Sequence, residues 1–336
     1  MRRAAVGFVV ALLVAACGTT PDAPPNHFTG PVTALVGGRV QPAPDVAVIE
    51  DGVVLIDGVL ISAVGSRKDV PIPADATVID CAGTTVLAGF WNSHVHFTQT
   101  VWAGAATAAA ERLEEALRAM LTSYGVVHAL DTGSLPSNTL AVRRRIESGE
   151  LAGPAIMMAS GTLVPEGGSP YYVLPSRLPE AKDERVTVAI VDAVLDRGAD
   201  GIKLFTGSWA TERSIVVMPV DFVRAATETA HRRGKFVIAH PSNSAGARAA
   251  IEGGVDILAH TFPTELDRGP WDRALPGMMI ERGVASCPRS SSSRPSYASS
   301  ACRLPSRRSC SASRRPSCAR SRRPEGRCCS APTLAT

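Results

Sequence analysis

TTVLAGFWNSHVH, residues 84–96, combines an apolar run with two histidines one residue apart. We expect a strand over residues 86–91, because a short apolar, β-branched run next to a glycine favours extended structure. Residues i and i+2 of a strand point to the same face, so His94 and His96 could hold one cation from a rigid element. Alone, this pair is a weak signal, since such pairs also occur on exposed strands and in loops.

Three polar residues lie at the ends of later apolar runs. Lys203 occurs in GADGIKLFTG, His240 in GKFVIAHPS and His260 in GGVDILAHTF. Helical apolar spacing precedes the last two runs, in VDFVRAATETAHRRG and SAGARAAIEGG, and each of these segments closes near a glycine suited to a helix C-cap. The alternation predicts β–α units that feed a parallel sheet.

The same patterns predict an α/β fold, an incomplete (β/α)8 TIM-type barrel over residues 89–285. A further helix is expected in ERLEEALRAMLTSYG, and Gly283-Val284-Ala285 begins a seventh strand. Eight such units close a barrel whose reactive groups lie at the carboxyl ends of the strands, where the lysine and the histidines fall. The six expected strands span residues 86–91, 126–130, 154–160, 201–206, 235–240 and 255–260.

The motif order resembles that of the amidohydrolase superfamily over roughly residues 30–285. Members carry HxH on strand 1, a lysine on strand 4 and single histidines on strands 5 and 6. The resemblance implies two divalent ions, expected to be zinc, and N-carboxylation of the lysine by carbon dioxide to give a bridging carbamate. Only a buried amine with a lowered pKa can react in this way. The implied metal ligands are His94 and His96 on one ion, His240 and His260 on the other, and Lys203 between them.

The resemblance also implies an activity. We expect a hydrolase of carbon–nitrogen bonds that uses a metal-bound hydroxide on a small amide or dipeptide, as in imidazolonepropionase-like and Xaa-Pro dipeptidase-like members. Deaminase-type members match less well, since they carry a glutamate shortly after the strand-5 histidine, where this chain has Pro241-Ser242-Asn243. The alternative is a non-catalytic exported lipoprotein that binds metal or ligand. No nucleic-acid partner is expected, and oligomeric state is not indicated.

The first 88 residues divide into three segments. Residues 1–17 resemble a lipoprotein signal peptide, with Arg2 and Arg3 before an apolar run and a lipobox that ends at Cys17, the expected lipidation site. We expect a membrane-anchored protein of the bacterial cell envelope; an ordinary secretory signal, with a secreted or periplasmic product, is the alternative. Residues 18–30 read as a flexible linker. Residues 31–88 alternate short apolar runs with Gly and Asp turns, an all-β pattern, and the family resemblance implies that they form part of a small β-sandwich; we expect Cys81 to be buried there.

Residues 286–336 differ in composition from the rest of the chain. They hold 11 of the 35 Lys and Arg, one of the 31 acidic residues, 15 serines and six of the eight cysteines, but no Val, Ile, Phe, Met or Trp. The remaining 285 residues carry 24 basic and 30 acidic side chains, a formal charge of −6, so the overall +4 belongs to the tail. Such a disordered tail cannot bury further barrel strands.

Three interpretations of the tail compete: a basic nucleic-acid-binding or acidic-partner segment, a disulfide-bonded segment, and a shift of reading frame near Ala285. We favour the frameshift. Read from the third base of each codon, Ser286-Cys287-Pro288-Arg289-Ser290 permits Val-Val-Pro-Thr-Leu, and residues 328–336 permit Leu-Phe-Gly-Thr-Asp-Val-Gly, which resembles the strand-8 signature. Third bases in codons 280–290 that exclude valine would eliminate this hypothesis.

No residue matches the strand-8 aspartate that serves as general base in the resembled family, so no catalytic residue is assigned. Asp256 and Asp267 flank strand 6, and Asp131 follows strand 2. We therefore expect the 336-residue chain to fold poorly and to be essentially inactive. We assign no function to His27, His128 or His231, and Tyr171, Tyr172 and Trp209 are candidates for either pocket lining or loop packing.

Overall fold

A computed structural model of the chain describes residues 31–260, 265 and 269–287. It divides into two compact units, residues 1–90 with 117–128 and residues 91–116 with 129–336, which are considered separately. The predicted signal peptide, lipidated cysteine, linker and most of the tail lie outside the described residues.

The first unit contains a five-stranded sheet with the order β3-β2-β1-β4, in which β5 also pairs with β1. The β-rich pattern expected of this segment is thus present. A buried apolar cluster on one face of this sheet contains Ala34, Val36, Val53, Leu55 and Val70. The expectation that Cys81 is buried was wrong, because it lies at a turn after β4 and is only half-buried. The strands are β1 (Thr33–Gln41), β2 (Ile49–Asp57), β3 (Leu60–Ser66), β4 (Thr77–Asp80) and β5 (Thr85–Leu87).

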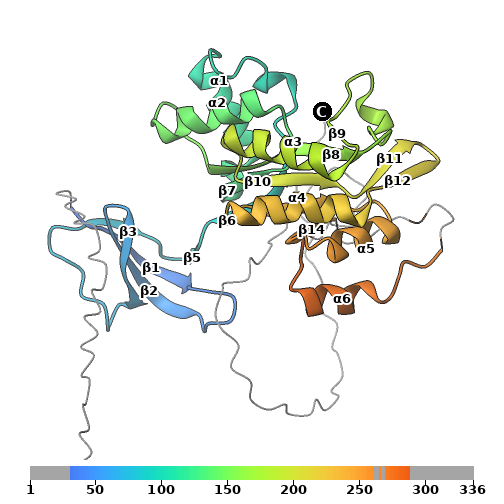
Figure 1. Cartoon of the computed structure of the whole chain (residues 1–336). Coiled ribbons are helices and arrows are strands. Elements are labelled where there is room, and N and C mark those ends of the chain that lie inside the picture. The colour runs from blue at the N-terminus through green and yellow to red at the C-terminus, as the bar shows by residue number, and fades with distance from the viewer. Residues whose placement is uncertain (1–30, 261–264, 266–268, 288–336) are drawn as a thin grey trace, which may run out of the picture. The chain divides into compact units, whose positions relative to one another are not determined.

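A parallel, nearly closed sheet dominates the rest of the chain; its seven barrel strands have the order β15-β14-β13-β10-β8-β7-β6, and the short β9 (Glu180–Ala181) also pairs with β8. Helices α3 (Glu184–Asp196) and α4 (Val220–Arg232) lie over this sheet in Figure 1. This arrangement confirms the incomplete barrel. The strands are β6 (Phe90–Val95), β7 (Val126–Asp131), β8 (Ala155–Pro165), β10 (Gly201–Phe205), β13 (Phe236–His240), β14 (Ile257–Ala259) and β15 (Ala285–Cys287).

The predicted bounds of the first barrel strand were wrong. Residues 85–87 form β5, which pairs with β1, and the barrel strand begins only at Phe90. Gly89 separates the two, and a Cβ there would lie 2.1 Å from a methyl carbon of Val127, so only glycine fits this passage. The Phe90 amide then donates to the carbonyl of Gly125 at 2.8 Å. The later start places His94 at the end of the strand rather than beyond it.

Helices alternate with the barrel strands, as the periodicity predicts. The three helices expected from sequence are present as α1, α4 and α5, and they are followed by glycines with positive φ at positions 125, 234 and 254. The β11–β12 hairpin was not predicted, and it places Trp209 in a strand rather than a loop. The helices are α1 (Ala110–Met120), α2 (Pro136–Glu147), α3 (Glu184–Asp196), α4 (Val220–Arg232), α5 (Ser244–Glu252) and α6 (Leu275–Arg282); the short strands are β9 (Glu180–Ala181), β11 (Gly207–Thr211) and β12 (Ser214–Val217).

Alternate residues of the central strands pack on opposite faces of the sheet. Ile202 and Leu204 of β10 belong to the apolar cluster that includes α3, α4 and α5, so this face lies beneath the helices. Ile238 and Ile257 belong to a second cluster, together with Cys287 of β15. Because side chains alternate along a strand, Lys203 points to this second, inner face.

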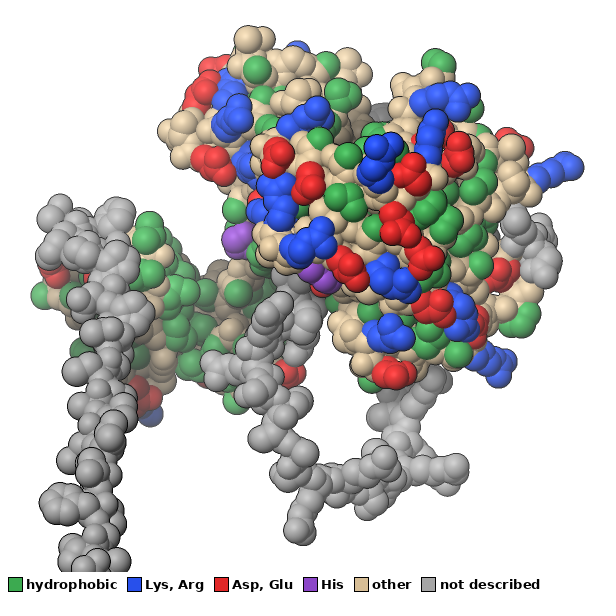
Figure 2. Space-filling view, in the orientation of Figure 1, with side chains coloured by type: hydrophobic (Ala, Val, Ile, Leu, Met, Phe, Trp, Pro, Cys, Tyr) green, Lys and Arg blue, Asp and Glu red, His purple; other side chains and the backbone are tan. Residues whose placement is uncertain are grey.

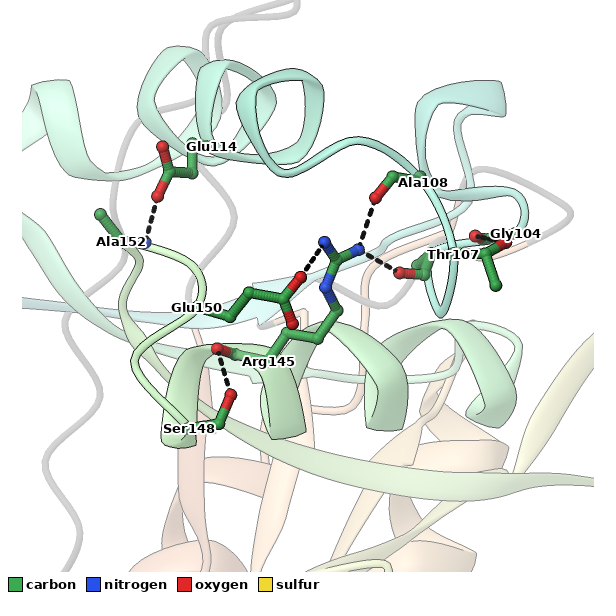
Figure 3. Close-up of polar contacts among 9 residues, drawn as sticks. Gly104, Thr107, Ala108, Glu114, Arg145, Ser148, Glu150 and Ala152 are labelled. Carbon is green, nitrogen blue, oxygen red and sulfur yellow. Dashed lines mark hydrogen bonds and ion pairs between the residues drawn. The ribbon is translucent and has the colours of Figure 1, made fainter.

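Arg145 of α2 forms hydrogen bonds with both the loop before α1 and the turn after α2 (Figure 3). Its guanidinium donates to the carbonyls of Ala105 and Ala108 at 2.8 and 2.7 Å and pairs with Glu150 at 2.5 Å. The side chain is 12% exposed, so these charge-assisted bonds are only weakly screened.

Replacing Arg145 with methionine is expected to lower the free energy of unfolding by about 2 kcal/mol, since it leaves two carbonyl groups without their charged donor. Arg144→Met is the matched control on the same helix, because Arg144 is exposed, and should change stability by less than about 0.5 kcal/mol. Urea unfolding monitored by circular dichroism measures both. Equal midpoints for the two variants would show that the Arg145 contacts contribute nothing.

Acidic and basic side chains are interspersed over α3 and α4 (Figure 2). Arg233 pairs with Asp196 at 2.8 Å, and Arg224 pairs with Asp221 at 2.6 Å. This face therefore presents no patch of a single charge. Among the described helices, none combines the length and the apolar composition that crossing a membrane requires.

Candidate metal centre

Four histidine rings from three strand ends form a continuous cluster. The Nε2 atoms of His94 and His96, at the end of β6, lie 3.2 Å apart. The His94 ring centroid is 4.7 Å from that of His260, after β14, and His260 is 4.9 Å from His240, the last residue of β13. The structure thus brings together the four histidines selected from sequence.

Lys203 lies on the inner face of β10 beside this cluster. It is 1% exposed, and its register partner on β13 is Ile238, two residues before His240. Its Nζ atom lies 5.7 Å from the ring centroid of Phe205, which in turn stacks on His240 at 4.6 Å. In the described part of the chain the Lys203 amine has no hydrogen bond or ion pair.

Burial is the main cause of the lowered pKa values of Lys203, His94 and His96. It lowers the pKa of Lys203 to about 7, although Cys287 and Asp131 act in the opposite direction. Burial, followed by the charge of Lys203, lowers the pKa of His96 to about 4 and that of His94 well below its ordinary value. The imidazoles of His94 and His96 are therefore neutral at neutral pH, which is the form that binds metal, and a large fraction of the Lys203 amine is neutral too.

His260 has a left-handed backbone, with φ of +69°. This conformation is uncommon outside glycine and costs of order 1 kcal/mol or more, and such strain concentrates at functional sites. The His260 amide donates to the carbonyl of Cys287 at 3.0 Å, which holds the strained residue against β15. The bond fixes the direction in which the imidazole leaves the strand end.

The His240 ring is directed by two neighbours that sequence analysis missed. Its Nε2 atom lies 3.0 Å from the hydroxyl of Ser242, and Phe205 covers its face. Among the described residues, no three His, Cys, Asp or Glu side chains converge on one point as a ready-made metal site. A rotation of His240 away from Ser242 would free its nitrogen.

The donor set nevertheless suits divalent ions such as zinc. Two nitrogens bound to one zinc ion at tetrahedral angles lie about 3.3 Å apart, close to the 3.2 Å between the Nε2 atoms of His94 and His96. The His94 and His96 rings are neutral, and the buried Lys203 amine lacks a hydrogen-bond partner in the described structure, as expected of a group that gains an oxygen-bearing anion. The residues present therefore fit the implied group.

Asp131 is fully buried near the centre, but it serves the scaffold. Its carboxylate accepts hydrogen bonds from the amides of Gly133 and Ser134 and from the hydroxyls of Ser134 and Thr139. These bonds order the turn into α2 and occupy both carboxylate oxygens. The described residues include no eighth strand, and so no aspartate in the position of a general base.

The other residues noted from sequence lie elsewhere. His128 is half-buried within β7, and His231 is largely exposed and pairs with Asp256 at 2.9 Å. Tyr171 and Tyr172 form an edge-to-face pair, 40% and 55% exposed. Cys287 was set aside with the tail, yet it is buried at the end of β15; its place directly after an apolar run was the signal available in the sequence.

Comparison with known proteins supplies the family. A sequence model described as the amidohydrolase family matches residues 85–295. No curated protein matches the chain at a significant level. The solved structures that match share the fold. A prolidase complexed with N-methylphosphonate-L-proline is 24% identical, with 76% of this chain and 66% of that one covered and a TM-score of 0.62.

Two further structures match to a similar extent. A Xaa-Pro dipeptidase with bound methionine is 22% identical, with 76% of this chain and 66% of that one covered and a TM-score of 0.63. The ochratoxinase of A. niger is 20% identical, with 76% and 64% covered and a TM-score of 0.62. The chain thus spans slightly less than two thirds of each of these proteins. The family match covers more than half of the chain, and its range, residues 85–295, includes the clustered residues: the chain belongs to the amidohydrolase family.

Proposed function

We propose that this protein is built as a metal-dependent hydrolase of carbon–nitrogen bonds in small amides or dipeptides. The observation that carries the proposal is the convergence of four histidines at the carboxyl ends of the barrel strands beside the buried Lys203 of β10. The solved structures whose names include prolidase and Xaa-Pro dipeptidase suggest an acyl-proline or similar dipeptide as substrate.

His94 and His96 would hold one ion, His240 and His260 the other, and Lys203, carboxylated by carbon dioxide, would lie between them. We expect zinc, because imidazole nitrogens suit it well. Two such ions, when bound, lower the pKa of a water molecule and polarise the substrate carbonyl. Phe205 and Ser242 orient the His240 ring, and the apolar inner face excludes bulk water from Lys203.

Proton transfer is the step for which the described residues supply no group. Asp131 is engaged by four hydrogen bonds and cannot take up the role without breaking them. We propose that the 336-residue chain retains the metal centre and has little or no turnover. A shift of reading frame near Ala285, which would encode the missing aspartate, remains our explanation.

A transition-state mimic tests the hydrolytic site without requiring turnover. A hydrolase site is expected to bind the tetrahedral N-methylphosphonate-L-proline at least about 100-fold more tightly than planar N-acetyl-L-proline, in a metal-dependent manner. Isothermal titration of the zinc-loaded chain with both compounds measures the ratio. Equal affinities would favour the alternative, a non-catalytic metal-binding or ligand-binding lipoprotein.

For localisation we propose a lipid anchor at Cys17, within residues that lie outside the described structure. Cys17→Ser is expected to move the protein from the membrane fraction to the soluble fraction of an expressing bacterium, because the new N-terminus can no longer be lipidated. Cys81→Ser serves as the control. Membrane association that survives Cys17→Ser would contradict the anchor.

A further inference from the structure

Cys287 lies beside the strand ends that carry two of the histidines. Its thiol approaches the carbonyl oxygen of Ser93, the residue before His94, at 3.9 Å. Cys287 pairs in register with Ala259 of β14, the residue before His260. The Cys287 carbonyl also accepts a hydrogen bond from the His260 amide at 3.0 Å. The rings of His94 and His260 are in contact at 4.7 Å, so Cys287 stands at the junction of the two.

The strand register places the thiol on the inner face of the sheet. Cys287 is 3% exposed and belongs to the same buried cluster as Ile238, the residue of β13 that pairs in register with Lys203 of β10. Ala259 beside it is small and fully buried, so no bulky side chain of β14 stands between β15 and β13 at this level. The thiol therefore lies on the same face of the sheet as Lys203, beside the strand ends that carry His94 and His260.

A second observation points to a ligand here. The Lys203 amine is fully buried beside the same histidines and has no hydrogen bond or ion pair among the described residues, although buried polar groups ordinarily have partners. The charge of Lys203 lowers the pKa values of His94 and His96, and Cys287 in turn acts on the pKa of Lys203, so the lysine lies near both the histidines and the cysteine. This part of the structure therefore combines nitrogen donors, an unsatisfied amine and a sulfur.

We propose that Cys287 is a further metal ligand of this centre, and that its sulfur makes the site prefer thiophilic ions such as zinc and cadmium over magnesium and manganese. The inference rests on the proposed metal centre. Ion binding would release the thiol proton to solvent and leave the thiolate coordinated. Soft sulfur ligands select such ions, whereas oxygen-only sites suit the harder ones. The shifted reading frame would place valine at this position, so the ligand belongs to the chain with the present sequence.

Cobalt titration of the full chain tests this directly, because a cobalt–thiolate bond gives a near-ultraviolet charge-transfer band. The band should be weakened in Cys287→Ser and in His94→Ala by the same increment, and unchanged in Cys81→Ser. Cysteines at positions 17, 302, 310, 318, 328 and 329 are common to all four proteins, so difference spectra remove their contribution. Cadmium affinity of Cys287→Ser should fall about 10–100-fold, with manganese affinity unchanged.

The outcomes separate the two proposals. A band that is unchanged in Cys287→Ser, or lost in Cys287→Ser but retained in His94→Ala, overturns the sulfur ligand. Cobalt binding that is unaffected by His94→Ala in every measurement overturns the metal centre itself. If Cys287→Ser does not fold, iodoacetamide labelling of the wild-type chain replaces it. Mass spectrometry of the Cys287 peptide should then show protection by cadmium and none by magnesium, and equal labelling would overturn the proposal.

Discussion

Lys203→Met is expected to reduce the divalent ions bound per chain from two to one or none. Methionine fills a similar volume at this fully buried position but cannot form a carbamate, so the two ions would lose the anion between them. Without that negative charge, two dications at close range repel each other. Metal analysis of dialysed protein measures the stoichiometry, with Lys182→Met, an exposed lysine, as the control.

The role of carbon dioxide can be separated from packing in the same system. Metal-free wild-type protein should take up its second ion faster when bicarbonate is added, whereas Lys203→Met should show no such dependence. Two ions retained by Lys203→Met, or uptake by the wild type that is indifferent to bicarbonate in degassed buffer, would contradict a bridging carbamate.

The second large effect is on the pH dependence of stability in metal-free, carbon-dioxide-free buffer. The pKa of Lys203 falls from its ordinary 10.5 to about 7 in the folded protein, which corresponds to a cost of about 5 kcal/mol for protonating the folded state. Between these values the unfolded chain binds the extra proton and the folded chain does not. Stability must therefore rise with pH from about 7 to about 10.5, and fall as pH is lowered through that window.

We expect the free energy of unfolding of the wild type to increase by about 3 kcal/mol between pH 7 and pH 9.5, relative to Lys203→Met. Urea unfolding at several pH values gives both curves. The lowered pKa values of His94 and His96 act in the same direction, but below about pH 6.5 and so outside this window; their effect should be smaller in Lys203→Met, which lacks the lysine charge that helps to lower them. Parallel curves above pH 7 would mean that Lys203 is hydrated or paired in solution.

The site was largely predictable because its residues occur at regular places in a repeating pattern of apolar strands and amphipathic helices. His240 ends an apolar run that follows a helical segment, His260 comes directly after another, and Lys203 lies within a third, so topology alone brings them together in neighbouring strands of a parallel sheet. The local details were not predictable in this way. Only Ala88 and Gly89 separate β5 from β6, too short a break to divide one apolar run into strands of two sheets.

Residues that act through packing also escaped prediction. Phe205 ends β10 and Ser242 follows β13, and only the three-dimensional structure shows that the first stacks on the His240 ring and the second contacts its Nε2 atom. The role of Cys287 was not recognised because it is the second residue of the tail, residues 286–336, whose composition indicates disorder. Asp131 could be recognised as structural only once its four hydrogen bonds were visible.

Zinc titration of the metal-free chain tests the central claim, a binuclear centre of four histidines and Lys203, most directly. Calorimetry should compare the wild type with the double variants His94→Ala/His96→Ala and His240→Ala/His260→Ala, all of which share the same tail cysteines. The account predicts that each double variant binds one zinc ion fewer than the wild type. Zinc stoichiometry that is the same in all three proteins would contradict it.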